Sequence, residues 1–202
     1  MDDIQDIKQT RAQRNNGLAF FMGFLRHPEQ VGSIIPSSRF LEQRLVGIAD
    51  MARAKLVLEL GPGTGGTTRA FLDALPEDGR LLAIELDSEF VSILKHDADP
   101  RLIVHQGNAE QIEEVLEQHH LPQPQVVISG IPFSTMSPTL GRRIIRKVWT
   151  CLSPGGDFIA YQFRGQVAHL GRKLLGKPET EIELLNVPPI RIYRWHKPKH
   201  SR

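Results

Sequence analysis

A glycine-rich stretch flanked by two carboxylates is the part of this sequence best suited to hold a nucleoside. The stretch LELGPGTGGTT runs from Leu58 to Thr68, and its glycines let the backbone turn tightly and approach a ligand that a Cβ atom would obstruct. Glu59 stands two residues before Gly61, where its charge suits an ammonium group and would repel a pyrophosphate. Glu85 stands 24 residues after Gly61, where a carboxylate accepts both ribose hydroxyls.

Residues after the next two apolar runs extend this predicted pocket. Leu86 is placed to lie against an adenine face, and Asn108, in the stretch GNAE, either bonds the adenine amino group or simply caps the helix that follows. Three successive strand ends of this kind predict a pocket for S-adenosylmethionine. A dinucleotide fits less well, because the chain lacks the length for the second domain that dehydrogenases usually carry. We expect no metal site, and the predicted cofactor-binding residues of this domain are Glu59, Gly61, Gly63, Thr64, Gly65, Glu85, Leu86, Asn108 and Ala109.

Short apolar runs that alternate with helical segments must position these residues. Such alternation is the signature of a parallel sheet with helices on both faces. The last two runs have only Val187-Pro188-Pro189 between them, which predicts an antiparallel hairpin at the end of the sheet. The fold class is therefore α/β, with the Rossmann-like layout of class I methyltransferases. We expect strands at 55–60, 80–85, 101–106, 125–129, 157–162, 181–186 and 190–195, and helices near 39–51, 66–75, 88–97, 109–119, 136–150 and 164–175.

The composition limits the classes of protein to which this chain can belong. With 40% hydrophobic and 24% charged residues, the 202 residues have an ordinary globular profile. The single Cys151 excludes an internal disulfide and any site with several cysteine ligands, which fits a reducing cytosolic compartment. The residues from Arg142 onward carry a net charge of +9 and the remainder −7, so one part of the surface suits a polyanion such as nucleic acid or anionic lipid. A basic surface that is merely solvated explains the same asymmetry.

An aromatic segment near the N-terminus is predicted to be a membrane-surface helix. The run LAFFMGFL, Leu18 to Leu25, is eight residues long, whereas a membrane-spanning helix needs about twenty. On a helical wheel its large apolar residues cover most of the surface, and Arg11, Arg14 and Arg26 could meet anionic headgroups. A helix simply packed on the domain is the alternative. We divide the chain into an N-terminal helix and lid connector, 1–38, and a methyltransferase domain, 39–202.

The chain resembles two related groups of methyltransferases. The stretches ELGPGTG, AIELD, GNAE and SGIPF are similar to those of the ribosomal RNA adenine dimethylases. The stretches FFMGFLRHPEQVGSIIPSSRF, LSPGGDFIAYQF and NVPPIRIYRW extend a closer resemblance, over nearly the whole chain, to bacterial phospholipid N-methyltransferases of the Rhodobacter type. That resemblance implies a lid over the cofactor, with Gln30, Gly32 and Ser33 in the lid connector, where they could touch the methionine end of the cofactor.

The corner VVISGIPFS, Val126 to Ser134, separates the two groups. Adenine methylases carry an Asn or Asp where this chain has Gly130, and that side chain accepts from the exocyclic amine while the aromatic residue stacks on the base. Gly130 offers no acceptor, which favours an aliphatic amine over a planar one. Phe133 and Tyr161 could line that amine's site or could be ordinary core residues. The predicted catalytic and acceptor-site residues are Ser129, Ile131, Pro132, Phe133 and Tyr161.

These features favour a cytoplasmic enzyme that binds the membrane surface peripherally. It would transfer the methyl group of S-adenosylmethionine to the headgroup amine of phosphatidylethanolamine and its mono- and dimethyl derivatives, toward phosphatidylcholine. Its expected partners are the phospholipid substrate and an anionic membrane surface, with no nucleic acid. An rRNA adenine N6-methyltransferase is the alternative, although such enzymes usually carry an extra C-terminal helical domain. A membrane-surface protein that keeps the fold without catalysis is the third hypothesis.

Overall fold

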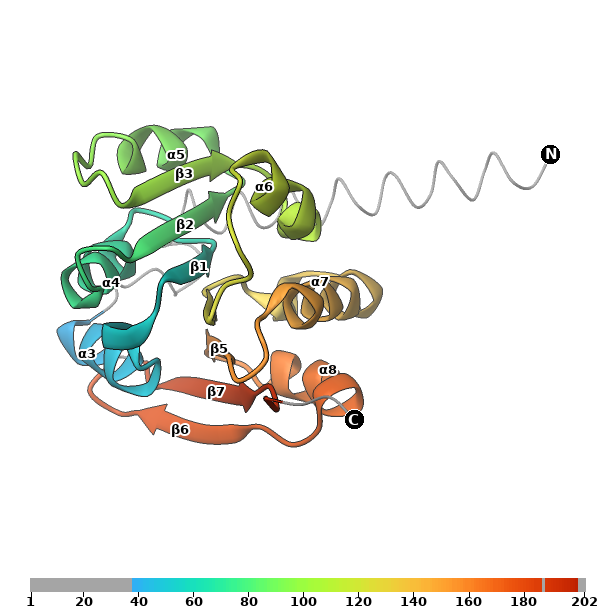
Figure 1. The fold of residues 1–202 in the computed structure, drawn as a ribbon. Coiled ribbons are helices and arrows are strands. Elements are labelled where there is room, and N and C mark those ends of the chain that lie inside the picture. The colour runs from blue at the N-terminus through green and yellow to red at the C-terminus, as the bar shows by residue number, and fades with distance from the viewer. Residues whose placement is uncertain (1–37, 187, 200–202) are drawn as a thin grey trace.

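A twisted seven-stranded sheet forms the centre of the protein (Figure 1). The computed structural model describes residues 38–186 and 188–199. Neighbouring strands follow the order β3-β2-β1-β4-β5-β7-β6, and β7 is antiparallel to both of its neighbours. The strands are β1 Leu56–Leu60, β2 Arg80–Glu85, β3 Leu102–Gln106, β4 Val126–Ser129, β5 Asp157–Gln162, β6 Glu179–Glu183 and β7 Ile190–His196.

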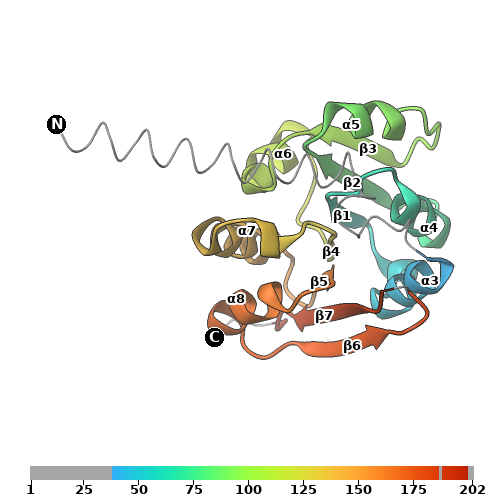
Figure 2. The same ribbon diagram turned by 180° about the vertical axis from the view of Figure 1, so that it is seen from behind.

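Helices cover both faces of this sheet, which is the predicted arrangement (Figures 1 and 2). One face packs against α3 and α4, and the other packs against α6, α7 and α8. The layout of parallel strands closed by a hairpin confirms the predicted Rossmann-like methyltransferase fold. The helices are α3 Arg39–Ile48, α4 Gly66–Ala74, α5 Ser88–Leu94, α6 Ile112–Gln118, α7 Pro138–Cys151 and α8 Gln166–Leu175, with short 3-10 turns η1 Met51–Arg53, η2 Ala109–Gln111 and η3 Phe133–Thr135.

The alternation of side chains along each strand decides which face a site residue meets. In β1, Leu58 and Leu60 join the core beneath α6, α7 and α8, whereas Val57 joins the core beneath α3 and α4. Glu59 shares the face of Val57 and therefore points toward α4. The same alternation in β2 and β5 places Glu85 and Tyr161 on this face.

The end of the sheet differs from the prediction in its boundaries. The strand expected at 181–186 is β6, Glu179–Glu183, and it forms the predicted antiparallel pair with β7. The chain turns after Glu183 because its carboxylate accepts a hydrogen bond from the backbone N–H of Leu185 at 2.9 Å. The apolar pair Leu184 and Leu185 therefore lies in an exposed turn and not in a strand.

The strand order reverses between β1 and β4, and this is the place where the fold favours a ligand. The chain leaves β1 toward β2 on one side, whereas β4 pairs with β1 on the other side. Crevices at the carboxyl ends of strands beside such a switch point hold the ligands of open α/β sheets. The ends of β1, β2, β4 and β5 carry the predicted site residues, so the fold gathers them along one edge.

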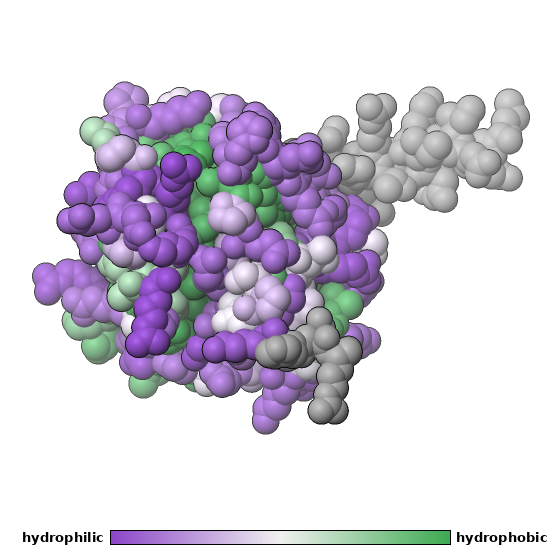
Figure 3. Space-filling view, viewed as in Figure 1, coloured by the Kyte–Doolittle hydropathy of each residue, from purple (hydrophilic) through white to green (hydrophobic). Residues whose placement is uncertain are grey.

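The predicted N-terminal helix and the lid connector up to residue 37 lie outside the described part of the chain, so the division after residue 38 stays a prediction. Among the described residues, no helix is long and apolar enough to cross a membrane. The face in Figure 3 is mostly hydrophilic, with its largest hydrophobic area in the upper centre, near the end of β2, and smaller ones at the lower left, over α3 and the turn after β6.

Candidate active site

The loop between β1 and α4 needs glycine for its backbone conformation. Gly61, Gly63 and Gly65 have φ angles of +71°, +59° and +88°, in the left-handed region that other residues rarely adopt. A Cβ atom on Gly61 would lie 3.1 Å from Cγ1 of Ile131, so this glycine also permits a close approach to the acceptor corner. A Cβ atom on Gly63 would meet nothing within 4 Å, which leaves open space above the middle of the loop.

The carboxylate of Glu85 ties this loop to the end of β2. It accepts hydrogen bonds from the backbone N–H groups of Gly63, Leu86 and Asp87 at 3.0, 2.7 and 3.0 Å. Burial raises the pKa of Glu85, and the three N–H groups oppose that shift because they stabilise the ionised form. The carboxylate therefore lies beside the glycine loop, at the position from which the sequence predicted that it would bind a ribose.

Glu59 is fully buried beneath the same loop. Its two carboxylate oxygens accept hydrogen bonds from the hydroxyls of Thr67 and Thr68, at 2.5 and 2.7 Å, in the first turn of α4. Burial raises the pKa of Glu59 to about 7, although both hydroxyls lower it and the charge of Glu85 raises it further. Because no atom of Glu59 is exposed, its effect on a cation above the loop is electrostatic in this conformation.

The third strand end is occupied differently from the first two. Oδ1 of Asn108 accepts a hydrogen bond from the N–H of Glu110 at 2.9 Å and caps η2, as one of the two sequence interpretations expected. The side chain of Ala109 is buried in the core, and Leu86 is half-buried. The amide nitrogen of Asn108 takes no part in the cap, so the adenine contact stays a prediction for that atom. Thr64 is exposed in the glycine loop.

A tyrosine hydroxyl fills the space beside Gly130 at the end of β4. A Cβ atom on Gly130 would lie 2.4 Å from the hydroxyl oxygen of Tyr161, 2.9 Å from its Cζ and 3.1 Å from the carbonyl oxygen of Gly61. Cβ atoms essentially never approach a non-bonded heavy atom to 2.4 Å, so a side chain here would displace Tyr161. The structure thus brings Tyr161 to the corner and beside the glycine loop.

The hydroxyl of Tyr161 is held in its neutral form. Burial raises its pKa, the charge of Glu59 adds to the rise, a hydrogen bond with Thr67 lowers it, and Glu85 raises it further. Two carboxylates close to one neutral hydroxyl make the space above the glycine loop favourable to a cation. A sulfonium group and an ammonium group are both cations of this kind.

Phe133 lies in the core beneath the corner. It is fully buried, and a Cβ atom on Gly141 in α7 would lie 3.3 Å from its ring. Core packing, the alternative that the sequence left open, therefore describes Phe133 in this conformation, and its place in the acceptor site stays a prediction. Ser129 is also fully buried and receives only a long contact, 3.4 Å, from the N–H of Ile131. Ile131 and Pro132 are half-buried and border the glycine loop and η3.

The sequence analysis missed Gln162 and the two threonines of α4. The side chain of Gln162 donates to the carbonyl of Ile131 at 2.7 Å and accepts from the N–H of Phe133 at 3.2 Å, which fixes the corner. A glutamine that ends an apolar strand is the signal that could have revealed it. Thr67 and Thr68 follow Glu59 by eight and nine residues and fall in the first turn of the predicted helix. Because side chains alternate along a strand, the carboxylate of Glu59 could have been expected to point toward this helix.

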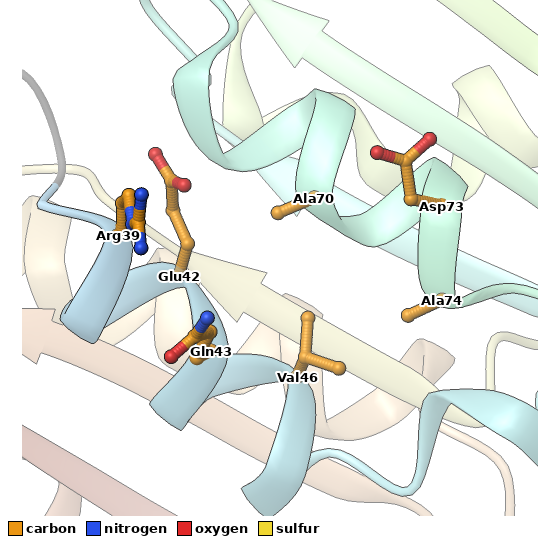
Figure 4. Close-up of a pocket in the computed structure, with 7 residues that line it drawn as sticks. All are labelled: Arg39, Glu42, Gln43, Val46, Ala70, Asp73 and Ala74. Atoms are coloured by element: carbon orange, nitrogen blue, oxygen red, sulfur yellow. The ribbon is translucent and has the colours of Figure 1, made fainter.

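The remaining predicted positions and the most evident pocket lie elsewhere. Gln30, Gly32 and Ser33 lie outside the described residues. A shallow pocket lies between α3 and α4, where Ala70 and Ala74 face α3 (Figure 4). All of its lining residues belong to these two helices, and none lies at the carboxyl end of a strand. The pocket is therefore separate from the site described above. Its lining consists of Arg39, Glu42, Gln43, Val46, Ala70, Asp73 and Ala74.

Known proteins are similar to this chain in sequence. Residues 57–156 match the family model described as a methyltransferase domain. The ornithine lipid N-methyltransferase of Singulisphaera acidiphila is 31% identical over 141 residues, which span 68% of this chain and 73% of that protein. The class I S-adenosylmethionine-dependent methyltransferases therefore include this protein.

More distant comparisons agree with this assignment. Ribosomal RNA small subunit methyltransferase A of Laribacter hongkongensis is 30% identical over 102 residues, which span 50% of this chain and only 37% of that protein. The O-methyltransferase TomG of Streptomyces achromogenes, solved in complex with S-adenosylmethionine, has the same fold, with a TM-score of 0.61 and 17% sequence identity. The match covers 77% of this chain and 79% of TomG. S-adenosylmethionine is the cofactor of this methyltransferase. The loop from Gly61 to Gly65, together with Glu85, stays the predicted place for it.

Proposed function

We propose that this methyltransferase N-methylates the headgroup amine of phosphatidylethanolamine, and of its mono- and dimethyl derivatives, at a membrane surface. The observation that carries the proposal is the position of Tyr161 beside Gly130. The acceptor corner keeps the strand end of amino-methylases but holds a neutral phenolic hydroxyl where they hold an Asn or Asp side chain.

A planar base amine fits this corner poorly. Its lone pair is delocalised into the ring, so it depends on an acceptor that draws the amino hydrogens and on an aromatic surface for stacking. Gly130 supplies no such acceptor, and Phe133 is fully buried, so its ring offers no surface to a base in this conformation. Both features weigh against adenine as the acceptor.

An aliphatic amine needs less from the corner. Its ordinary pKa resembles that of lysine, about 10.4, so it must lose a proton before it can attack. Desolvation beside apolar residues such as Ile131 lowers that pKa. Tyr161, with its raised pKa, is not a base near neutral pH, and it serves to position the amine nitrogen in line with the methyl group. Proton removal by solvent then suffices.

The charge balance of the transfer suits the buried carboxylates. The neutral amine attacks the methyl carbon, the bond from that carbon to sulfur breaks, and the positive charge moves from sulfur to nitrogen. Glu59 and Glu85 both act on the hydroxyl of Tyr161 through their charges, so they would favour a cation beside it throughout the transfer. The protein therefore contributes position and a preorganised negative field.

The comparisons support a lipid acceptor without choosing between lipids. The ornithine lipid N-methyltransferase covers most of the chain, and an ornithine headgroup also presents an aliphatic amine. Ornithine lipid is therefore the competing acceptor within the same proposal. The second candidate is an rRNA adenine N6-methyltransferase, which the 30% identity over the shared domain favours.

One labelling experiment separates these acceptors. Protein and methyl-labelled S-adenosylmethionine are incubated with vesicles that contain phosphatidylethanolamine, with vesicles that contain ornithine lipid, and with ribosomal RNA. We expect label in phosphatidylethanolamine, as mono-, di- and trimethyl products. Label in ornithine lipid alone would change the lipid but keep the corner chemistry. Label in RNA alone would overturn the proposal, and cofactor binding without transfer to any of them would support the non-catalytic hypothesis.

The proposal also assigns an anionic membrane as partner, through the aromatic N-terminal segment. Removal of residues 1–26 should reduce binding to vesicles that contain phosphatidylglycerol, while affinity for S-adenosylmethionine changes less. Equal vesicle binding by the shortened protein would show that this segment does not anchor the protein to the membrane.

A further inference from the structure

We propose that the turn after β6 docks the catalytic edge of the sheet on a lipid bilayer. The proposed docking surface consists of Leu184 and Leu185 in the turn and Phe40 in α3, whose N-cap Ser38 is hydrogen-bonded to Asn186 of the turn. This inference rests on the proposed function, because it assumes an acceptor delivered from a membrane.

Large apolar side chains at this end of the molecule are unusually exposed. Leu184 and Leu185 are 69% and 62% exposed, and Ile182 and Phe40 are 49% and 48% exposed. These are four of the five large exposed hydrophobic residues found in the described part of the chain, and the fifth, Ile93, lies in α5 beside the other end of the sheet. Single exposed leucines are ordinary, whereas a cluster marks a contact surface.

The turn that presents these leucines is held by buried polar contacts. Glu183, only 4% exposed, accepts from the N–H of Leu185 and pairs with Arg44 of α3 at 3.1 Å. Asn186 is buried as well, donates to the carbonyl of Pro188 and accepts from the N–H of Ser38 at 3.4 Å. The polar residues of the turn thus face inward and its two leucines face outward. This arrangement is the reverse of the usual one, in which apolar side chains are buried and a carboxylate is exposed.

The register places the docking surface at the edge that carries the acceptor corner. Gln162, which fixes the corner, pairs with Arg191 of β7, and Arg191 pairs with Ile182 of β6. Neighbouring strands lie about 4.8 Å apart, so Ile182 is roughly 10 Å from Gln162. Because β6 runs in the direction of β5, the turn that follows it projects at the carboxyl ends of the strands. A bilayer on this turn would lie next to the corner.

The charges around the turn suit anionic headgroups. Arg39, Arg164 and Arg191 are exposed near this edge, and none of them forms an ion pair within the described residues. The acids of β6 are only partly offset, since Arg44 pairs with both Glu181 and Glu183, and Arg194 pairs with Glu179. Exposed leucines flanked by arginines combine insertion into the interface with attraction to anionic lipid.

A second copy of the chain is a poorer occupant than a bilayer. The route to self-association here is strand pairing along β6, the edge strand of the sheet. Glu179 and Glu181 are exposed on that edge, so two copies paired through it would bring like charges together. The bilayer has no such conflict, because it meets the protruding turn and not the strand edge.

The test uses the full chain with the double variant Leu184→Ser/Leu185→Ser, and Ile93→Ser as the matched control. Binding is measured by co-sedimentation with vesicles of phosphatidylethanolamine and phosphatidylglycerol in a 3:1 ratio. We expect the double variant to lose about tenfold or more of its vesicle affinity and the control to bind like the original protein. Thermal unfolding of both variants verifies that the fold persists.

Activity assays separate this inference from the proposed function. The double variant should lose methyl transfer to vesicles but retain transfer to phosphatidylethanolamine with six-carbon chains, which dissolves as monomers. If no lipid is methylated but vesicle binding still depends on the leucines, the docking surface stands and the proposed substrate falls. Unchanged vesicle binding by the double variant overturns the docking surface. So does a dimer that the double variant dissociates in size-exclusion chromatography, because the turn would then contact a second copy.

Discussion

The cofactor half and the acceptor half of the site are built by different means. At β1, α4 and β2 the backbone determines the geometry, through three left-handed glycines and three N–H groups that donate to one carboxylate. At β4 and β5 the geometry depends on side chains, since Tyr161 fills the space at Gly130 and Gln162 holds the turn. The first half is suited to one invariable ligand, and the second can change its acceptor by exchanging side chains.

The largest expected effect comes from Glu85, which serves both the loop and the predicted ribose contact. Glu85→Ala removes the partner of three N–H groups and the acceptor of two ribose hydroxyls. Hydrogen bonds to charged groups contribute about 1.5–3 kcal/mol each, so S-adenosylmethionine affinity should fall roughly 100-fold or more in calorimetry. Glu89→Gln, exposed on the neighbouring α5, is the control and should bind normally. Unchanged affinity in Glu85→Ala would refute the ribose contact.

Tyr161→Phe tests the acceptor half without disturbing the cofactor half. The ring remains while the hydroxyl that positions the amine is lost, so kcat should fall about 10- to 100-fold while the affinity for S-adenosylmethionine stays within about twofold. Tyr193→Phe, a buried tyrosine of β7, is the matched control and should retain full activity. An equal loss of cofactor affinity in Tyr161→Phe would place its hydroxyl in the cofactor half instead.

This difference between the halves explains what the sequence could predict. The glycine loop, Glu59 and Glu85 lie within one βαβ unit, where spacing along the chain fixes position in space, and the strand order follows from alternating apolar runs. The corner brings Gly130 against Tyr161, 31 residues later, and this contact depends on how two strands pair. The burial of Phe133 depends on α7 and α8, which pack beneath it. The exposed leucines were mistaken for strand residues because apolar residues normally signal burial.

Gly130→Ala, combined with Tyr161→Phe, measures the contact that carries the proposed function. The added Cβ atom meets the hydroxyl oxygen at 2.4 Å, so Gly130→Ala alone should reduce the free energy of unfolding by about 1–3 kcal/mol. In the Tyr161→Phe background the nearest ring carbon is 2.9 Å away, and the cost should be smaller but not zero. Urea denaturation of the four proteins gives the coupling. Strict additivity would show that Tyr161 does not occupy this space in solution.

The last expected effect is a dependence on pH that belongs to the cofactor half. The pKa of Glu59 is about 7 in the folded protein, above its ordinary value of 4.5. The folded state therefore favours the neutral carboxyl, and the free energy of unfolding of the cofactor-free protein should decrease as pH rises from 4.5 to about 7. A cationic cofactor favours the ionised form, so its affinity should instead fall as pH decreases below 7, by no more than about tenfold per pH unit.

Glu59→Gln separates these two opposite trends from those of Glu85, whose pKa is also raised by burial. The variant keeps an acceptor for one of Thr67 and Thr68 and removes the ionisation. Relative to the original protein it should gain stability at pH 8, where the buried charge is most costly, and bind S-adenosylmethionine more weakly with a flatter pH profile. If the profile keeps its slope, the proton belongs to Glu85, and the negative field that favours the sulfonium would come from the ribose-binding carboxylate, not from the one beneath the loop.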